Sequence, residues 1–76
     1  MTLRDLDVGK SGRVMTVGGA RALRRRLLDM GITPRTTITV KKIAPLGDPI
    51  ELFLRGYVLT LRLEDAEKIT IEEVAA

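Results

Sequence analysis

The stretch RLLDMGITPRTTITVKKIAPLGDPI, residues 26–50, holds the end of a helix, two proline-containing turns and a strand in direct succession. Leu27 belongs to a helical pattern, and Gly31 follows where a helix end needs a left-handed residue. Ile32 can fold back onto Leu27 as the apolar contact of that helix end. Pro34 then prevents the helix from resuming. The stretch therefore predicts a helix that ends before Gly31 and an extended segment beyond it.

Hydrophobic periodicity around this stretch predicts a mostly β chain with one real helix. The helix is expected at residues 20–30, and its buried stripe consists of Ala20, Leu23, Leu27 and Met30. Strands are expected at residues 13–17, 36–43, 50–54, 57–63 and 68–74, and a short helical turn at residues 64–68. Five short strands with one helix inserted after the first favour a small closed β-barrel, because closure removes the free edges of a sheet.

Two local features fix the register of the expected strands. Ile43 breaks the alternation of its strand, and a bulge near residues 41–42 would restore it and bend the strand. A two-residue loop at residues 55–56 places Leu54 opposite Tyr57. The alternating apolar residues of the two strands then share one face, which supports this pairing.

The composition excludes several classes of function. The chain has 76 residues, no Cys and no His, with one Phe and one Tyr as its aromatic residues. A chain of this length is expected to form one domain, residues 1–76, with a core of Leu, Ile and Val. Without thiolates or imidazoles, and with no nucleophile–base pair, the sequence predicts no catalytic, cofactor or metal site. No apolar run approaches the ~20 residues that cross a bilayer, so no direct membrane insertion is expected.

The charges are unevenly distributed along the chain. Residues 1–46 hold ten Lys/Arg and three Asp/Glu, a net +7, while residues 47–76 hold three and seven, a net −4, which together give +3. This asymmetry suggests a dipolar surface and a partner with an acidic patch. The alternative is that folding mixes the two halves in space, and the sequence leaves both interpretations open.

The expected helix carries a candidate binding surface. Arg21, Arg24 and Arg25 lie away from the buried stripe, and Leu28 projects among them. A leucine within an arginine cluster is typical of a protein interface. The alternative is a solvated helix face on which Arg25 pairs with Asp29. Nucleic acid is a weaker candidate partner, because base stacking needs exposed aromatic side chains and the chain has only two aromatic residues.

Two further candidates lie beyond the helix. The loop at residues 44–49 contains two prolines, so it would present Leu46, with Asp48 beside it, at a small entropic cost. The alternative is that Leu46 caps the core. Phe53 should point outward opposite Val58 and form an apolar nucleus for a partner, unless the helix or the N-terminal segment covers the pair.

The order and spacing of several motifs resemble the FeoA family along nearly the whole chain. The matching pieces are Arg26-Leu27-x-x-Met30-Gly31-Ile32-x-Pro34, Ala44-Pro45-Leu46-Gly47-Asp48-Pro49-Ile50, Arg55-Gly56-Tyr57-x-Leu59-x-Leu61-Arg62 and Glu64-x-Ala66. The resemblance implies a small SH3-like β-barrel of about five strands with one inserted α-helix. It also implies a cytoplasmic, non-enzymatic accessory protein of bacterial ferrous iron uptake.

The partner that this resemblance implies is the membrane transporter FeoB, with its cytoplasmic GTP-binding domain, which would hold the chain peripherally at the inner membrane. Arg55 and Arg62 become candidates for contact with that domain, because an arginine supplied in trans can stabilise the transition state of phosphoryl transfer. Arg62 could instead pair with Glu51 on the sheet. Two alternatives stay open: the C-terminal SH3-like barrel of a metal-dependent regulator of the diphtheria-toxin-repressor family, and an RNA-binding barrel. Self-association is also left open.

The sequence departs from the family pattern at one position, Arg35, where the family usually has Gly after the turn proline. A type II turn needs a positive φ at this position, which Arg adopts reluctantly. A type I turn or a strained turn is therefore expected at residues 33–36.

Overall fold

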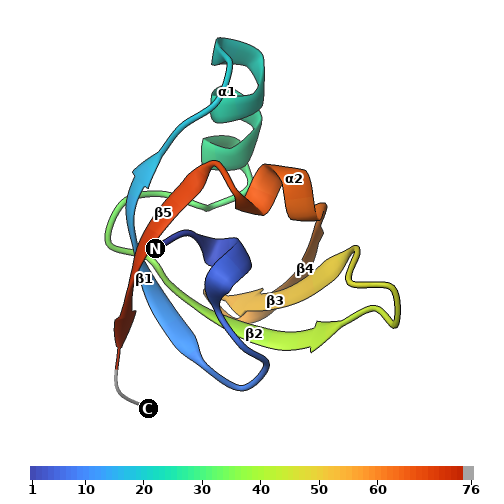
Figure 1. Cartoon of the computed structure of the whole chain (residues 1–76). Helices are drawn as coiled ribbons and strands as arrows, with labels where there is room; N and C mark the ends of the chain where they lie inside the picture. Colours follow the sequence, from blue (N-terminus) through green and yellow to red (C-terminus); the bar gives the residue numbers. More distant parts are fainter. Residues whose placement is uncertain (75–76) are drawn as a thin grey trace.

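The computed structural model describes residues 1–74. Its elements are η1 (Leu3–Asp5), β1 (Ser11–Val17), α1 (Arg21–Asp29), β2 (Thr37–Ile43), β3 (Ile50–Leu54), β4 (Tyr57–Leu61), α2 (Leu63–Ala66) and β5 (Ile69–Val74). The strands form one antiparallel sheet in the order β4-β3-β2-β1-β5. The small, mostly β fold with one main helix was therefore predicted correctly (Figure 1).

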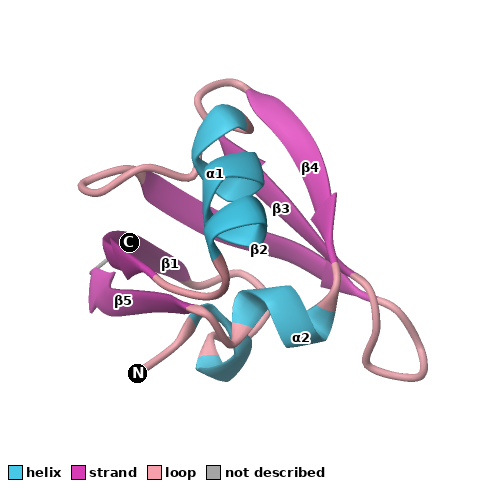
Figure 2. Cartoon of the chain, turned by 90° about the horizontal axis from the view of Figure 1, so that it is seen from above, coloured by secondary structure: helices cyan, strands magenta, loops and turns pink. Residues whose placement is uncertain are grey.

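The expected closure of the barrel is wrong, because β4 and β5 are the outer strands of the sheet and do not pair with each other within residues 1–74. The chain between them forms α2, and α1 and α2 both lie between these outer strands (Figure 2). The strongly bent sheet thus wraps around the core, and the two helices fill the space between its outer strands β4 and β5.

The two register predictions are confirmed. The pairing of β2 with β3 shifts between Val40 and Lys42, which places a bulge where the alternation breaks. Leu54 pairs with Tyr57 across the β3–β4 turn. Arg55 and Gly56 both have positive φ, at 48° and 85°, as a type I′ turn requires.

The helix α1 ends as its sequence predicts. The Ile32 amide donates to the Leu27 carbonyl at 3.1 Å and the Gly31 amide donates to Leu28 at 3.0 Å, with Gly31 at a φ of 97°. This is the Schellman arrangement, and Leu27 and Ile32 are both fully buried. The expected buried stripe is wrong at one position, because Ala20 precedes the helix and is exposed.

Several element boundaries also differ from expectation, by one or two residues each. β1 begins at Ser11, because its pairing with β2 and β5 extends to that residue. β4 ends at Leu61, since Leu63 begins α2 and does not continue the strand. The Leu63 amide instead donates to the Asp48 carboxylate at 2.9 Å, so a side chain from the β2–β3 loop satisfies the first turn of α2.

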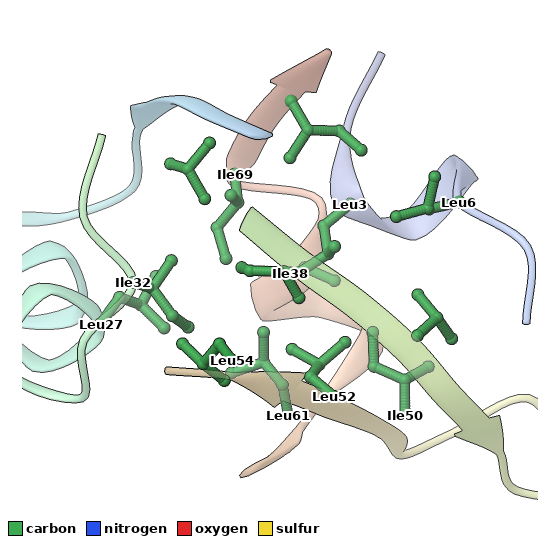
Figure 3. Packing of buried hydrophobic residues seen from close by; sticks show 14 of the residues in the cluster. Leu3, Leu6, Leu27, Ile32, Ile38, Ile50, Leu52, Leu54, Leu61 and Ile69 are labelled. Atoms are coloured by element: carbon green, nitrogen blue, oxygen red, sulfur yellow. The ribbon is translucent and has the colours of Figure 1, made fainter. Parts of the chain in front are cut away.

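The core is one apolar cluster to which all five strands, α1, α2 and the N-terminal segment contribute. Figure 3 shows the labelled side chains pointing toward one another: Leu3, Leu6, Leu27, Ile32, Ile38, Ile50, Leu52, Leu54, Leu61 and Ile69. Ile69 and Ile71 of β5 are buried, as the alternation of that strand predicts.

The N-terminal segment lies along β5, which the sequence did not predict. The Ile71 amide donates to the Met1 carbonyl at 2.9 Å, and Thr2 forms an isolated bridge with Thr70. The segment is held by η1, in which Thr2 and Asp5 form a capping box, and by Leu3, which is fully buried. The free edge of β5 is therefore partly covered by the start of the chain.

The turn at residues 33–36 takes the strained alternative. Arg35 has a φ of 76°, and the Thr36 amide donates to the Thr33 carbonyl at 3.1 Å. A positive φ at the third residue of such a turn is the type II arrangement, so the type I alternative is wrong. The Arg35 amide donates to the Val14 carbonyl at 2.7 Å, which helps to hold this conformation.

Candidate functional site

The arginine cluster of α1 is exposed, as expected, but its members differ. Arg21 and Arg25 are exposed, while the Arg24 Nε donates to the Val17 carbonyl at 3.0 Å. Leu28 is half-buried and packs against the core, so it does not project freely among the arginines. Among residues 1–74, the ion pairs do not include Arg25 with Asp29. The surface is therefore cationic rather than apolar.

The guanidinium of Arg55 donates hydrogen bonds to other residues of the same chain. Its Nε donates to the Gly31 carbonyl at 3.3 Å, and its Nη2 donates to the hydroxyls of Thr33 and Thr36 at 2.8 and 2.9 Å. The neighbouring Tyr57 hydroxyl donates to a carbonyl at the end of α1. These bonds fasten the β3–β4 turn to the end of α1. An arginine used in this way is less free to reach a partner than its position suggests.

The β2–β3 loop presents Leu46 to solvent. The side chain is 97% exposed, so the alternative in which it caps the core is wrong. The Gly47 amide donates to Ala44 at 2.7 Å, and the Ala44 amide donates to Pro49 at 3.0 Å. With Pro45 second and Gly47 fourth, this is a well-formed turn that holds Leu46 at its tip. Figures 1 and 2 both show this loop projecting away from α1.

The outward-facing pair on the β3–β4 hairpin is also exposed. Phe53 pairs directly with Val58, and the side chains are 40% and 53% exposed. Neither α1 nor the N-terminal segment covers the pair, so the expected orientation is confirmed. The Lys41 ammonium lies 5.6 Å from the centre of the Phe53 ring, within the range of a cation–π contact.

A cleft of about 460 Å³ runs between β4, α1 and α2. Its lining consists of Arg26, Met30, Thr60, Leu61, Arg62, Glu64 and Asp65. At one side, the Arg26 Nη2 lies 3.2 Å from a carboxylate oxygen of the nearly buried Asp65. Arg62 lies 3.9 Å from Glu64, not beside Glu51, and both side chains of this pair are about three-quarters exposed. A second hollow, lined by Asp48, Pro49, Arg62 and Glu64, joins this cleft to the base of the β2–β3 loop.

Folding mixes much of the charge that the sequence segregates. Of the four ion pairs among residues 1–74, three join the basic first part of the chain to its acidic second part: Arg4–Glu67, Arg13–Glu72 and Arg26–Asp65. These pairs engage Asp65 of α2, Glu67 directly after α2, and Glu72 of β5. Positive charge stays uncompensated on the outer side of α1 and at Arg55.

Five of the candidate residues fall into two groups. Asp48 and Arg62 both line the second hollow, at the base of the loop that carries Leu46. Arg21 and Arg25 lie on α1, away from the loop (Figure 1). Sequence reasoning missed Thr60 and Met30 as cleft residues, and no local pattern signals them, because the cleft exists only where the sheet stays open beside β4.

Neither a metal site nor a membrane span is found in the described part of the chain. Within residues 1–74, no three carboxylates gather as a set of metal ligands. With no His and no Cys in the sequence, the residues present do not fit a transition-metal site. No described helix is long and apolar enough to cross a membrane.

These observations define a small β domain with exposed cationic and apolar surfaces, which is typical of a module that binds another protein. The FeoA domain model matches residues 1–73, and the chain belongs to the FeoA domain family. The predicted family resemblance is confirmed.

Related proteins carry the same domain in different settings. The chain is 38% identical over 76 residues to an Fe(2+) transport protein A/Fe(2+) transporter FeoB fusion protein of Porphyromonas gingivalis; this covers the whole chain and 9% of the fusion protein. It is 41% identical to the solution structure of FeoA from Chlorobium tepidum, covering 99% of this chain and 71% of that chain at a TM-score of 0.92.

The SH3-like character of the fold is supported by a third relative. FeoA of Stenotrophomonas maltophilia, described as a procaryotic SH3 domain protein and solved with zinc, is 25% identical, with a TM-score of 0.83 over 95% of this chain and 89% of that chain. The SH3-like fold is therefore confirmed, although the sheet of this chain is not strictly closed. The zinc belongs to that protein.

Metal-dependent regulators share this fold, as one alternative anticipated. A manganese-dependent transcriptional repressor matches 97% of this chain and 36% of its own chain, with a TM-score of 0.88 and 18% identity. An identity this low shows the fold alone and does not favour a regulatory function.

Proposed function

We propose that this chain is an accessory protein of bacterial ferrous iron uptake that acts on the cytoplasmic side of the membrane by direct contact with FeoB. The observation that carries the proposal is the fusion protein, in which a homologue of the whole chain is joined to FeoB in one polypeptide. Fusion keeps two domains at a high effective concentration, which is useful when they act together. The role is binding rather than catalysis.

The GTP-binding domain of FeoB is the proposed contact. Leu46 is a suitable anchor, because it is almost fully exposed on a hydrogen-bonded turn and would lose little conformational entropy on binding. Arg21 and Arg25 on α1 supply positive charge that would speed association with an acidic surface. Of the two arginines singled out by the resemblance, Arg62 is the better candidate to reach a bound nucleotide, since Arg55 is held by Gly31 and Thr33.

The test is a calorimetric titration of the chain into the cytoplasmic domain of FeoB from the same organism, with and without nucleotide. Saturable binding is expected, and Leu46→Ala should weaken it at least about tenfold, as loss of an interface anchor does. Met15→Ala is the matched control, because Met15 is an exposed apolar residue on a different strand.

Two other outcomes would decide against the proposal. No binding up to the millimolar range would overturn direct contact with that domain. Tighter binding to RNA, with a steep loss of affinity as salt rises, would favour the RNA-binding alternative instead.

A further inference from the structure

We infer that the free edge of β4 is a docking site for an extended segment of a partner polypeptide that has acidic residues at both ends. This segment would pair with β4 as a sixth strand of the sheet. The inference depends on the proposed function only for the identity of the protein that supplies the segment. It rests on the hydrogen bonding of β4, on the cleft beside it and on the charges at its two ends.

The backbone of β4 has unused hydrogen-bonding groups at two residues. In a two-residue hairpin the residues that flank the turn form a hydrogen-bonded pair, so Leu54 bonds Tyr57 and, two residues on, Leu52 bonds Leu59. The N–H and C=O groups of Val58 and Thr60 therefore point away from β3. Within residues 1–74, no turn, loop or side-chain hydrogen bond uses the backbone of either residue.

The space beside this edge can accept the side chains of an added strand. Thr60 and Leu61 line the cleft, together with Met30, the C-terminal cap residue of α1. On the outer face, an added strand would continue the row formed by Phe53 and Val58. Alternate residues of the segment would thus meet an apolar row outside and the cleft inside, which gives sequence preference to a contact made mainly by backbone groups.

The charges at the ends of β4 select an acidic segment. Arg55 precedes the strand and bonds only carbonyl and hydroxyl oxygens, with no carboxylate partner among residues 1–74. Arg62 follows the strand, and its pair with Glu64 is long and largely exposed, so it contributes little. A segment with acidic residues at both ends would meet uncompensated positive charge at both ends of the edge.

The same charges disfavour a second copy of this chain as the occupant. Antiparallel pairing of two β4 edges would place Val58 opposite Thr60 of the other copy. Arg55 of one copy would then lie beside Arg62 of the other at both ends of the new ladder, and like charges placed opposite one another destabilise a strand pair. Continuity with the second hollow also favours a partner segment, because a chain leaving the edge past Arg62 would reach the Leu46 loop.

The experiment follows amide hydrogen exchange by NMR on the full chain. In the free protein the Val58 and Thr60 amides should exchange much faster than those of Leu59 and Leu61. The probe is a short peptide of alternating valine and threonine with glutamates at both ends. It should slow exchange at Val58 and Thr60 by at least about tenfold at saturation. The same peptide with alternate residues N-methylated should not slow this exchange, because it cannot donate the strand hydrogen bonds. A peptide with lysines in place of the glutamates should bind more weakly than the original peptide.

Variants of Thr60 separate strand pairing from other contacts. Thr60→Pro removes the outward N–H and should weaken peptide binding at least about tenfold, while proline is tolerated where an edge N–H faces solvent. Thr60→Val keeps the N–H and should bind normally. Circular dichroism of both variants confirms that the fold is retained.

Every result bears on the inference. Peptide binding that leaves the Val58 and Thr60 amides unprotected would overturn it, and so would a dimer of the free protein in which these amides are already protected. If the FeoB domain binds without protecting them, this surface is not the FeoB contact but the proposed function stands. If the peptide protects them and the FeoB domain does not bind, the docking edge stands and the proposed function fails.

Discussion

The two outer strands of the sheet, β4 and β5, differ in what lies along their free edges. The N-terminal segment covers β5, through the bond from the Ile71 amide to Met1 and the bridge between Thr2 and Thr70. No described segment pairs with β4, and a cleft lies beside it instead. In this chain of 76 residues, the N-terminal segment thus lies along the edge of β5, while no described segment pairs with the edge of β4.

If the inferred docking at β4 is right, one sheet serves stability at one edge and binding at the other. An open edge is an aggregation hazard that proteins usually blunt with short strands and charged residues. β4 has five residues, with Arg55 before it and Arg62 after it, and these features oppose self-pairing. The covered edge instead contributes buried area, since Leu3 and Leu6 both join the core.

Loss of the buried anchor at the covered edge should have the largest effect. Leu3→Ala removes a fully buried side chain and should lower the free energy of unfolding by about 2–5 kcal/mol, as other buried leucines do. Urea unfolding measures the change, and Leu46→Ala, at an exposed leucine, should cost less than about 0.5 kcal/mol. Equal effects of the two variants would show that the N-terminal segment does not stabilise β5.

If Leu3→Ala leaves too little folded protein for urea unfolding, amide exchange still tests the same point. The Ile71 amide should then exchange as fast as that of Val58, because its acceptor at Met1 is no longer held in place.

Proline at matched threonines should distinguish the two strands. Thr60 and Thr70 are both exposed and lie on the two outer strands. The Ile71 amide faces Met1, so the Thr70 amide faces β1, whereas the Thr60 amide faces the open edge. Thr70→Pro should therefore lower the free energy of unfolding by about 1–3 kcal/mol, because it removes a hydrogen bond between β5 and β1. Thr60→Pro should lower it clearly less, because no hydrogen bond of the sheet is lost. Similar costs measured by urea unfolding would mean that β4 is not open on that side.

Features set by local chemistry were predictable from the sequence. The end of α1 follows from Gly31 and Ile32, because few residues other than glycine allow the left-handed conformation there. The register of the β3–β4 hairpin follows from a two-residue loop with alternating apolar residues on both sides. In each case the residues that decide the structure lie within a few positions of one another.

Features that depend on distant segments were not predictable. The sheet stays open because α2 follows β4 where a closing strand would have to pair, and nothing in the alternation of either strand reports this. The role of Arg55 was missed for the same reason, since its acceptors at Gly31, Thr33 and Thr36 are about twenty residues away. Its match to a family position suggested a partner contact, while the geometry gives it an internal one.

Arg35 and Arg55 allow a comparison within one chain, because both are arginines with positive φ and only one uses its side chain. Arg55 makes three hydrogen bonds through its guanidinium beside the open edge. Within residues 1–74, the side chain of Arg35 makes none, and only its amide is bonded, to Val14 of β1. The same substitution at the two positions should therefore have opposite effects on stability.

Arg35→Gly should stabilise the fold slightly. Relief of the left-handed conformation should raise the free energy of unfolding by about 1–2 kcal/mol. The extra entropy of glycine in the unfolded chain should lower it by about 0.5–1 kcal/mol, so a net increase of about 0.5 kcal/mol is expected. Arg55→Gly relieves the same strain but removes the three hydrogen bonds that the guanidinium donates to the Gly31 carbonyl and to two hydroxyls, so a net loss of about 1 kcal/mol is expected. Urea midpoints that move in the same direction for both variants would contradict this account, because the backbone term is shared and only the side-chain bonds differ.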